Sequence, residues 1–310
     1  MRTPPIFIFG IILILFLGIV TAAIGAFYLT DGKPFEVVNQ YGDTVKLSGQ
    51  GIYANDSYFK APIFQATDLV MLFISVPLLL ISSFLLRKSR SFRNRLFNIA
   101  VLAVFVYYSA SMAFGATFNS LHLAYIALFS SSLFCLVFSV HSFLREAPQD
   151  LIQKRLPYKG FYVFLVFSGL ALILAWLPDI LSANLAGQSL KMIEVYTTEI
   201  TYVLDMGIIG PSAIVALYLL RKRHISGYIL LAMLLTLCAV IGVMLPVQTL
   251  YQAQAGIVLP LPVMITKVGA FCILAGFAIF YLVRLLAAVK SEKSQPILDN
   301  AAPMIESGLK

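Results

Sequence analysis

The chain has 310 residues, of which 60% are hydrophobic and 12% are charged, and its formal net charge is +8. Because an average soluble domain is about 25% charged, this composition excludes an ordinary water-soluble fold and makes the lipid bilayer the expected main solvent. The positive charge does not indicate a nucleic-acid partner, since the basic residues are confined to short links between apolar runs.

Eight apolar segments are long enough to cross a bilayer, which takes about 20 residues. They lie at residues 5–30, 66–87, 94–115, 118–144, 159–181, 200–220, 225–249 and 258–289. The first segment is longer than the apolar part of a signal peptide, about 7–15 residues, so we expect it to be retained as a helix. The sequence therefore predicts an all-α integral membrane protein with eight transmembrane helices.

Two long connections lie on the same predicted side of the membrane. Residues 31–65 are polar, and their segment FEVVNQYGDTVKLSG has two short extended runs on either side of the turn residues Tyr41, Gly42 and Asp43. This pattern predicts a small β-hairpin. Residues 183–199 form the corresponding connection after the fifth helix.

The basic residues predict the orientation. They are concentrated in the links after the second, fourth and sixth helices and after the eighth, for example in RKSRSFRNR and RKRH. Since basic loops stay in the cytoplasm, we expect a multi-pass plasma (cytoplasmic) membrane protein with cytoplasmic N- and C-termini. The hairpin would then be extracytoplasmic, and residues 291–310 would form a disordered cytoplasmic tail.

One phrase occurs twice in the chain. Residues 77–88 read PLLLISSFLLRK and residues 211–222 read PSAIVALYLLRK, with five of twelve positions identical. Helices that end in the cytoplasm commonly finish with leucines and basic residues, so the phrase alone is a weak signal. Together with the matching order of loops, it predicts a parallel 4+4 repeat. The halves would be residues 1–150, with outer loop 31–65, and residues 151–290, with outer loop 183–199.

Ionisable residues inside the membrane are candidates for function, because they are costly in hydrocarbon. Asp205 lies sixteen residues before Arg221, about 24 Å along a helix, and Lys267 lies seventeen before Arg284, about 25 Å. The two therefore have similar depths, and we expect them to form an ion pair. This pair would either bind a ligand or ion, or serve only to lock the two halves together.

The remaining candidate ligand- or ion-binding residues are also expected toward the outer side. Asp68 precedes Pro77 and alternatively caps the start of a helix beside Thr67. His122 and Asn119 are expected to open the fourth helix. With Asp205 and Lys267, they predict an outward-facing pocket between helices 2, 4, 6 and 8. Further acids flank the membrane segments at Asp179, Glu194 and Glu199.

No motif indicates a catalytic residue, a metal or another cofactor. His122 and His141 lie on one predicted helix and cannot clamp a haem between facing helices. The segment TKVGAFCIL, around Lys267, resembles the retinal-binding lysine segment of microbial rhodopsins over about nine residues. That resemblance implies a Schiff-base lysine. The aromatic retinal box is missing, however, because Trp176 is the chain's one tryptophan, and the fourth helix carries no acidic counter-ion.

These features favour transport of a small solute or ion. The alternative is a non-enzymatic binding, sensory or accessory subunit that binds a lipid or a partner membrane protein. A third interpretation is an intramembrane enzyme acting on a lipid, for which Asp205, Asp68 and His122 would be the available groups.

Overall fold

The computed structural model describes residues 5–148 and 150–291, without the side chains of Val263, Thr266 and Lys267. The predicted tail therefore lies outside the described residues beyond Ser291. The elements in chain order are α1 (Pro5–Phe27), β1 (Phe35–Val38), β2 (Thr44–Leu47), η1 (Gly51–Tyr53), α2 (Ala61–Val70), η2 (Met71–Ser75), α3 (Val76–Lys88), α4 (Phe92–Gly115), α5 (His122–Glu146), α6 (Tyr158–Ala186), α7 (Ile200–Leu204), η3 (Asp205–Ile209), α8 (Gly210–Arg221), α9 (Ile225–Gln254), α10 (Leu261–Val263), η4 (Met264–Gly269) and α11 (Ala270–Ala288).

Eight helices in the described part of the chain are long and apolar enough to cross a membrane. The chain is therefore an all-α, polytopic membrane protein that contacts the lipid bilayer. The second and sixth spans contain the π-helical segments η2 and η3, and the π-helical segment η4 directly precedes the eighth span. Several ends differ from the prediction. The second span begins at Ala61, the fifth ends at Ala186 instead of residue 181, and the eighth begins at Ala270 instead of residue 258.

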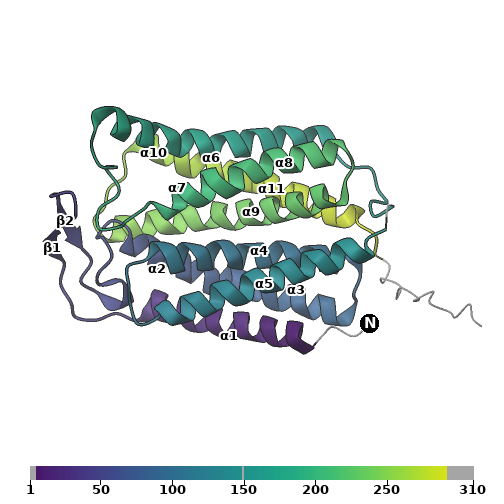
Figure 1. Cartoon of the computed structure of the whole chain (residues 1–310), viewed down its shortest axis with the longest axis horizontal. Coiled ribbons are helices and arrows are strands. Elements are labelled where there is room, and N and C mark those ends of the chain that lie inside the picture. Colours follow the sequence, from purple (N-terminus) through teal and green to yellow (C-terminus); the bar gives the residue numbers. More distant parts are fainter. Residues whose placement is uncertain (1–4, 149, 292–310) are drawn as a thin grey trace, which may run out of the picture.

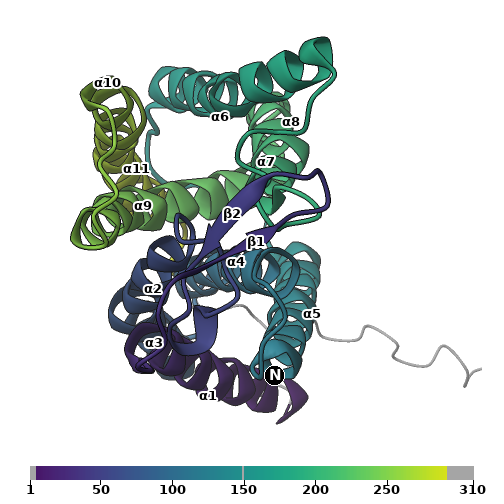
Figure 2. The same ribbon diagram turned by 90° about the vertical axis from the view of Figure 1, so that its left-hand side faces the viewer.

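The helices form two groups that lie side by side (Figures 1 and 2). In the first group, α1 packs against α2 and α5, and α4 packs against α3 and α5. In the second group, α8 packs between α6 and α9, and α9 packs against α11. The groups meet mainly where α9 contacts α2 and α4, and where α4 contacts α7. Helix α4 is the most buried of the eight spans, so it forms the centre of this junction.

The two ends of the bundle differ in character. At one end, here called the hairpin end, β1 and β2 pair antiparallel, with Phe35 opposite Leu47. Figure 2 shows these strands lying across the junction of the two helix groups. Hydrogen bonds from the Asn39 amide to the Glu194 carbonyl and from the Gln40 amide to the Tyr196 carbonyl hold them there. At the opposite, basic end lie the Arg- and Lys-rich links after α3, α5 and α8.

Candidate functional site

Asp205 is held between the two helix groups. It is the first residue of η3, and its side chain is buried. The Tyr107 hydroxyl on α4 donates to its Oδ1 at 3.0 Å, and the Trp176 Nε1 on α6 donates to its Oδ2 at 2.9 Å. Both donors are neutral, so the carboxylate is fixed in position without an ion pair among the described side chains.

A cavity of about 40 Å³ lies beside Asp205 inside the second helix group. This volume has room for a few water molecules or one small ion, since one water needs about 10–15 Å³. Its other polar lining side chains are those of Ser168 and Cys238, and the rest of the lining is small or apolar. The Asp205 carboxylate is therefore the one acidic group that lines this cavity among the described residues.

A line of contacts connects Asp205 with the hairpin end. The Trp176 ring stacks on the Tyr202 ring, with centroids 4.6 Å apart and planes inclined by 22°. The Tyr202 hydroxyl donates to Asp179 Oδ2 at 2.9 Å, and Asp179 is exposed. Asp179 thus contributes to positioning Tyr202 and Trp176, and Trp176 holds Asp205. The place of Asp179 at the end of an apolar segment had suggested only an interfacial role.

Asp68 is buried in the first helix group. Asp68 is completely inaccessible to solvent. The Tyr108 hydroxyl donates to its Oδ1 at 2.5 Å, and the Tyr53 hydroxyl donates to its Oδ2. Because α2 begins at Ala61, Asp68 lies inside the helix, and the interpretation that it caps a helix start is wrong.

Gly25 of α1 makes room for the Asp68 carboxylate. A Cβ atom at this glycine would collide with Asp68 Oδ2 and crowd the Tyr53 hydroxyl. The carboxylate therefore packs directly on the backbone of α1. Together with the two tyrosines, this contact encloses Asp68 on several sides.

The two carboxylates share one supporting helix. Tyr107 and Tyr108 are consecutive residues of α4, yet they donate to carboxylates of different helix groups. A second polar contact crosses the same junction, because the Gln248 amide on α9 donates to Thr67 Oγ1 on α2 at 2.8 Å. Thr67 directly precedes Asp68, so each carboxylate lies beside a hydrogen bond between the groups.

The other candidate residues lie elsewhere or are only partly described. The backbone of Lys267 lies in η4, but its side chain is outside the described residues, so its pairing with Asp205 stays a prediction. Asn119 and His122 lie at the turn between α4 and α5. The Asn119 side chain accepts a hydrogen bond from the Leu121 backbone at 2.9 Å, and the His122 ring packs on Phe118. These contacts shape the turn.

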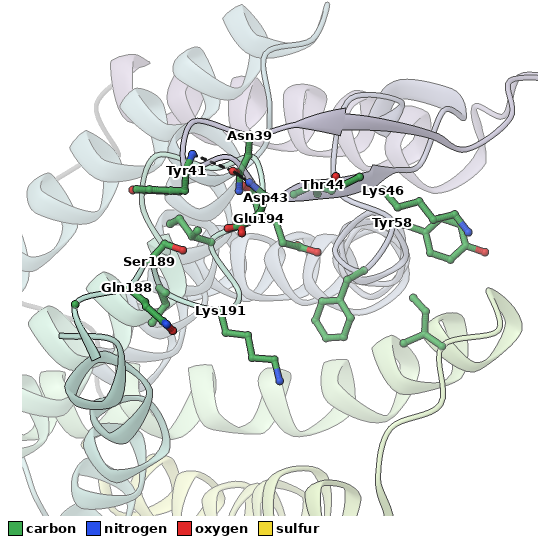
Figure 3. A pocket seen from close by; sticks show the side chains of 16 residues that line it. Asn39, Tyr41, Asp43, Thr44, Lys46, Tyr58, Gln188, Ser189, Lys191 and Glu194 are labelled. Atoms are coloured by element: carbon green, nitrogen blue, oxygen red, sulfur yellow. Dashed lines mark hydrogen bonds between the residues drawn. The ribbon is translucent and has the colours of Figure 1, made fainter. Parts of the chain in front are cut away.

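The hairpin end carries a large open pocket of about 980 Å³ between β1–β2 and the connection after α6. In Figure 3, Lys46 and Tyr58 lie at one side of it, Gln188 and Ser189 lie at the other, and Glu194 lies between them. The lining carries acidic, basic and amide groups. This pocket and the cavity beside Asp205 share no lining residue.

A buried ion pair joins the groups beneath this pocket. Lys60 Nζ contacts Glu199 Oε2, and both side chains are almost fully buried. The Lys60 ammonium also lies 4.0 Å from the centre of the Tyr196 ring. Glu199 is therefore a structural partner of the first helix group, whereas its sequence position suggested an interfacial acid.

Asp56 is a second buried acid at the hairpin end. Its Oδ1 accepts hydrogen bonds from the Thr117 backbone at 2.9 Å and from the Tyr196 hydroxyl at 3.1 Å. Its Oδ2 is buried with no partner among the described residues. Burial raises the pKa of Asp56 to about 6. Burial likewise raises the pKa of Glu194, whose carboxylate accepts a hydrogen bond from Ser57.

Little in the amino-acid sequence pointed to the groups that hold these acids. Tyr107, Tyr108 and Trp176 lie in apolar segments, where aromatic residues are common, and Tyr53 lies in the polar connection 31–65. The one available signal was the pair of consecutive tyrosines in the middle of the third span. No cluster of three or more potential metal ligands occurs among the described residues. Comparisons with models of known protein families, with curated proteins and with solved structures found no match.

Proposed function

We propose that this protein is a membrane carrier for a small solute or ion, and that Asp205 and Asp68 are the groups that couple transport to protons. The observation that carries this proposal is the arrangement on α4, where consecutive tyrosines hold one carboxylate from each helix group. A relative movement of the groups would change the surroundings of Asp205 directly, because its two donors come from different groups.

The chemistry of a buried carboxylate supports coupling to protons. An isolated ionised carboxylate is expensive in hydrocarbon, so each acid exchanges its proton when water or a cationic group reaches it. At Asp205 the adjoining cavity supplies the space for such an approach. Loss of the proton leaves an anion that a bound cation neutralises. This exchange couples the movement of the proton to the movement of the cation.

A parallel 4+4 repeat would supply the moving parts, and three features favour it. In both halves a π-helical segment ends two residues before a proline, at Ser75 before Pro77 and at Ile209 before Pro211. Helices of one half meet their counterparts across the junction, as α4 meets α9. An ion pair joins Lys60, which directly precedes α2, to Glu199, which directly precedes the corresponding helix α7.

These features agree with rocking of one half against the other. The halves would be residues 1–150 and 151–290, related by an axis along the membrane normal. Local π-helical turns are frequent at functional sites, and those in η2 and η3 lie beside Asp68 and Asp205. They provide places where the second and sixth spans can bend.

The orientation follows from charge. Basic links favour the cytoplasm, so the basic end and both termini would be cytoplasmic in the plasma membrane. The hairpin end would face outward, and its open pocket would be the first place where a solute meets the protein. The β-hairpin would then form an extracytoplasmic cover over the junction.

Reconstituted protein tests this function. Liposomes with a trapped pH-sensitive dye are exposed to a panel of small cations, amino acids and sugars. We expect proton movement that depends on one class of solute and that is lost in Asp205→Asn. Arg87→Gln, at the exposed basic end, is the matched control and should behave as the unaltered protein. Proton movement of equal size in Asp205→Asn would contradict the role of this carboxylate.

A binding or accessory role is the second candidate, and the open pocket at the hairpin end favours it. That pocket is large, and its lining includes both acidic and basic side chains. It shares no lining residue with the cavity beside Asp205. If it binds a partner membrane protein, Lys46→Ala with Lys191→Ala will release the partner from the purified complex. In that case solute will drive no proton movement in liposomes.

A further inference from the structure

We propose that a groove at the basic end binds the phosphate-bearing headgroup of an anionic lipid. The groove has a volume of about 830 Å³ and lies between the connection leading into α6 and the start of α9. This site is remote from the carboxylates and does not depend on the proposed transport activity. Its ligand class follows from the fixed walls, the charge and the position of the groove.

The connection that forms one wall is fixed by the end of α11. The Gln153 backbone donates to the Ala288 carbonyl at 2.8 Å, and the Lys290 backbone donates to the Leu151 carbonyl at 2.9 Å. Ile152 and Val289 form a β-bridge between these two hydrogen bonds. This wall is therefore held in place before any ligand binds, which lowers the entropic cost of binding.

Arg223 forms the opposite wall in an unusual backbone conformation. Its φ of 56° lies in the left-handed region, which residues other than glycine rarely adopt. The guanidinium lies 3.5 Å from the centre of the Tyr158 ring, and the Tyr158 hydroxyl hydrogen-bonds the Tyr228 hydroxyl at 2.9 Å. Stacking thus orients a planar cation, which suits phosphate, at the edge of the groove.

The groove carries positive charge without a compensating acid. Lys154, Arg155 and Lys159 line it together with Arg223, and all four side chains are exposed. No Asp or Glu is among its described lining residues. The neighbouring Asp150 already contacts Lys290, at 3.4 Å. The N-terminus of α6, which begins at Tyr158, adds its partial positive charge beside the same groove.

The position of the groove favours a lipid over a soluble anion. It lies where the membrane spans α6 and α9 begin, at the depth of lipid headgroups, and basic pockets there are suited to such headgroups. Its lining also includes the half-buried apolar side chains of Pro157 and Ile225. These side chains can contact the glycerol and upper acyl region of a lipid, whereas a free phosphate ion has no apolar part to contact them.

Lipid binding to the purified full-length protein tests the proposal. Native mass spectrometry compares retention of phosphatidylglycerol with that of phosphatidylcholine of the same chain length. We expect selective retention of phosphatidylglycerol, and a loss of affinity of about tenfold to thirtyfold in Arg223→Gln with Lys159→Gln, because each basic residue near anionic lipid contributes about fivefold and two are removed. Lys154→Gln with Arg155→Gln, in the exposed connection, should cause a similar loss without unfolding.

The matched control is Arg87→Gln with Lys88→Gln, which removes the same charge from the same end outside the groove lining. It should leave lipid retention unchanged. An equal loss in the control would overturn the proposal in favour of general charge attraction. Binding of inorganic phosphate that displaces the lipid at similar concentrations would overturn the lipid assignment in favour of a soluble anion.

Discussion

Tyr107 and Tyr108 are neighbours on α4 and donate hydrogen bonds in different directions, Tyr107 to Asp205 and Tyr108 to Asp68. Consecutive residues of a helix point about 100° apart, so one helix at the junction can hold an acid from each group. Helix α4 therefore contacts both carboxylates through adjacent residues.

Removal of one tyrosine hydroxyl should weaken this arrangement. Tyr107→Phe leaves Asp205 Oδ1 without its hydrogen-bond donor, and we expect the free energy of unfolding to fall by about 1–3 kcal/mol, the cost of a buried group losing its partner. Thermal unfolding in detergent measures the change. Tyr41→Phe, at an exposed turn, serves as the control. Equal midpoints for both variants would show that the Tyr107 bond contributes nothing.

A methyl group on Gly25 should disturb the enclosure of Asp68. Gly25→Ala places a Cβ against the Asp68 carboxylate, and such overpacking costs about 1–3 kcal/mol. The control is Gly276→Ala, because nothing lies within 4 Å of a Cβ at that position. We expect a lower unfolding temperature for Gly25→Ala alone. A stable Gly25→Ala variant would mean that α1 does not press on Asp68.

The ion pair between Lys60 and Glu199 should show the behaviour of a buried pair. Lys60→Met leaves the Glu199 charge uncompensated, and we expect a loss of about 3–5 kcal/mol. The double variant Lys60→Met with Glu199→Leu should recover much of this loss. Asp150→Asn, which breaks an exposed pair, should change stability by less than about 1 kcal/mol. A double variant no more stable than Lys60→Met would refute the direct pairing.

Asp56 should make the stability depend on pH. Its pKa is raised by burial from 3.8 to about 6, so the folded protein binds the proton more tightly than the unfolded chain. The contribution is fully present below pH 3.8, is lost as the pH rises to about 6, and is constant above that value. The loss is about 3 kcal/mol for a shift of this size.

Asp56→Asn should flatten this dependence, as measured by unfolding midpoints across a pH series. Glu194, whose pKa is also raised by burial, contributes a change of the same sign, so part of the slope should remain. Glu36→Gln, on the exposed hairpin, is the control. A slope unchanged in Asp56→Asn would rule out this residue as its source.

The sequence predicted the membrane class well, because apolar length alone identifies a span. The eight segments correspond to eight described helices, although most of their ends moved by up to five residues and the start of the eighth moved from 258 to Ala270. Composition could not show where α6 ends, because that depends on the glycine at 187, which adopts a left-handed conformation.

The candidate site was only partly predictable. The cost of a charge in hydrocarbon identified Asp68 and Asp205 without a structure. Their donors could not be found in this way, because Tyr53 is fifteen residues from Asp68 and Tyr107 is 98 residues from Asp205. Likewise, Lys60 and Glu199 are 139 residues apart. Such partners depend on how the helix groups meet, and no local pattern encodes that.

The most direct test of the carrier proposal is the distance between the two helix groups. Spin labels at Ser120→Cys and Asn184→Cys, exposed positions on different groups at the hairpin end, report this distance by pulsed electron resonance in nanodiscs. The three native cysteines are replaced by serine. Asn184→Cys with Ala253→Cys, both in the second group, gives the control distance.

We expect two distance populations between the groups, with proportions that change from acidic to alkaline buffer. In Asp68→Asn with Asp205→Asn one population should persist at every pH, while the control distance stays constant throughout. A single distance that is the same at all pH values, in the unaltered protein as in the double variant, would contradict the claim that these carboxylates couple protons to a movement of the two groups.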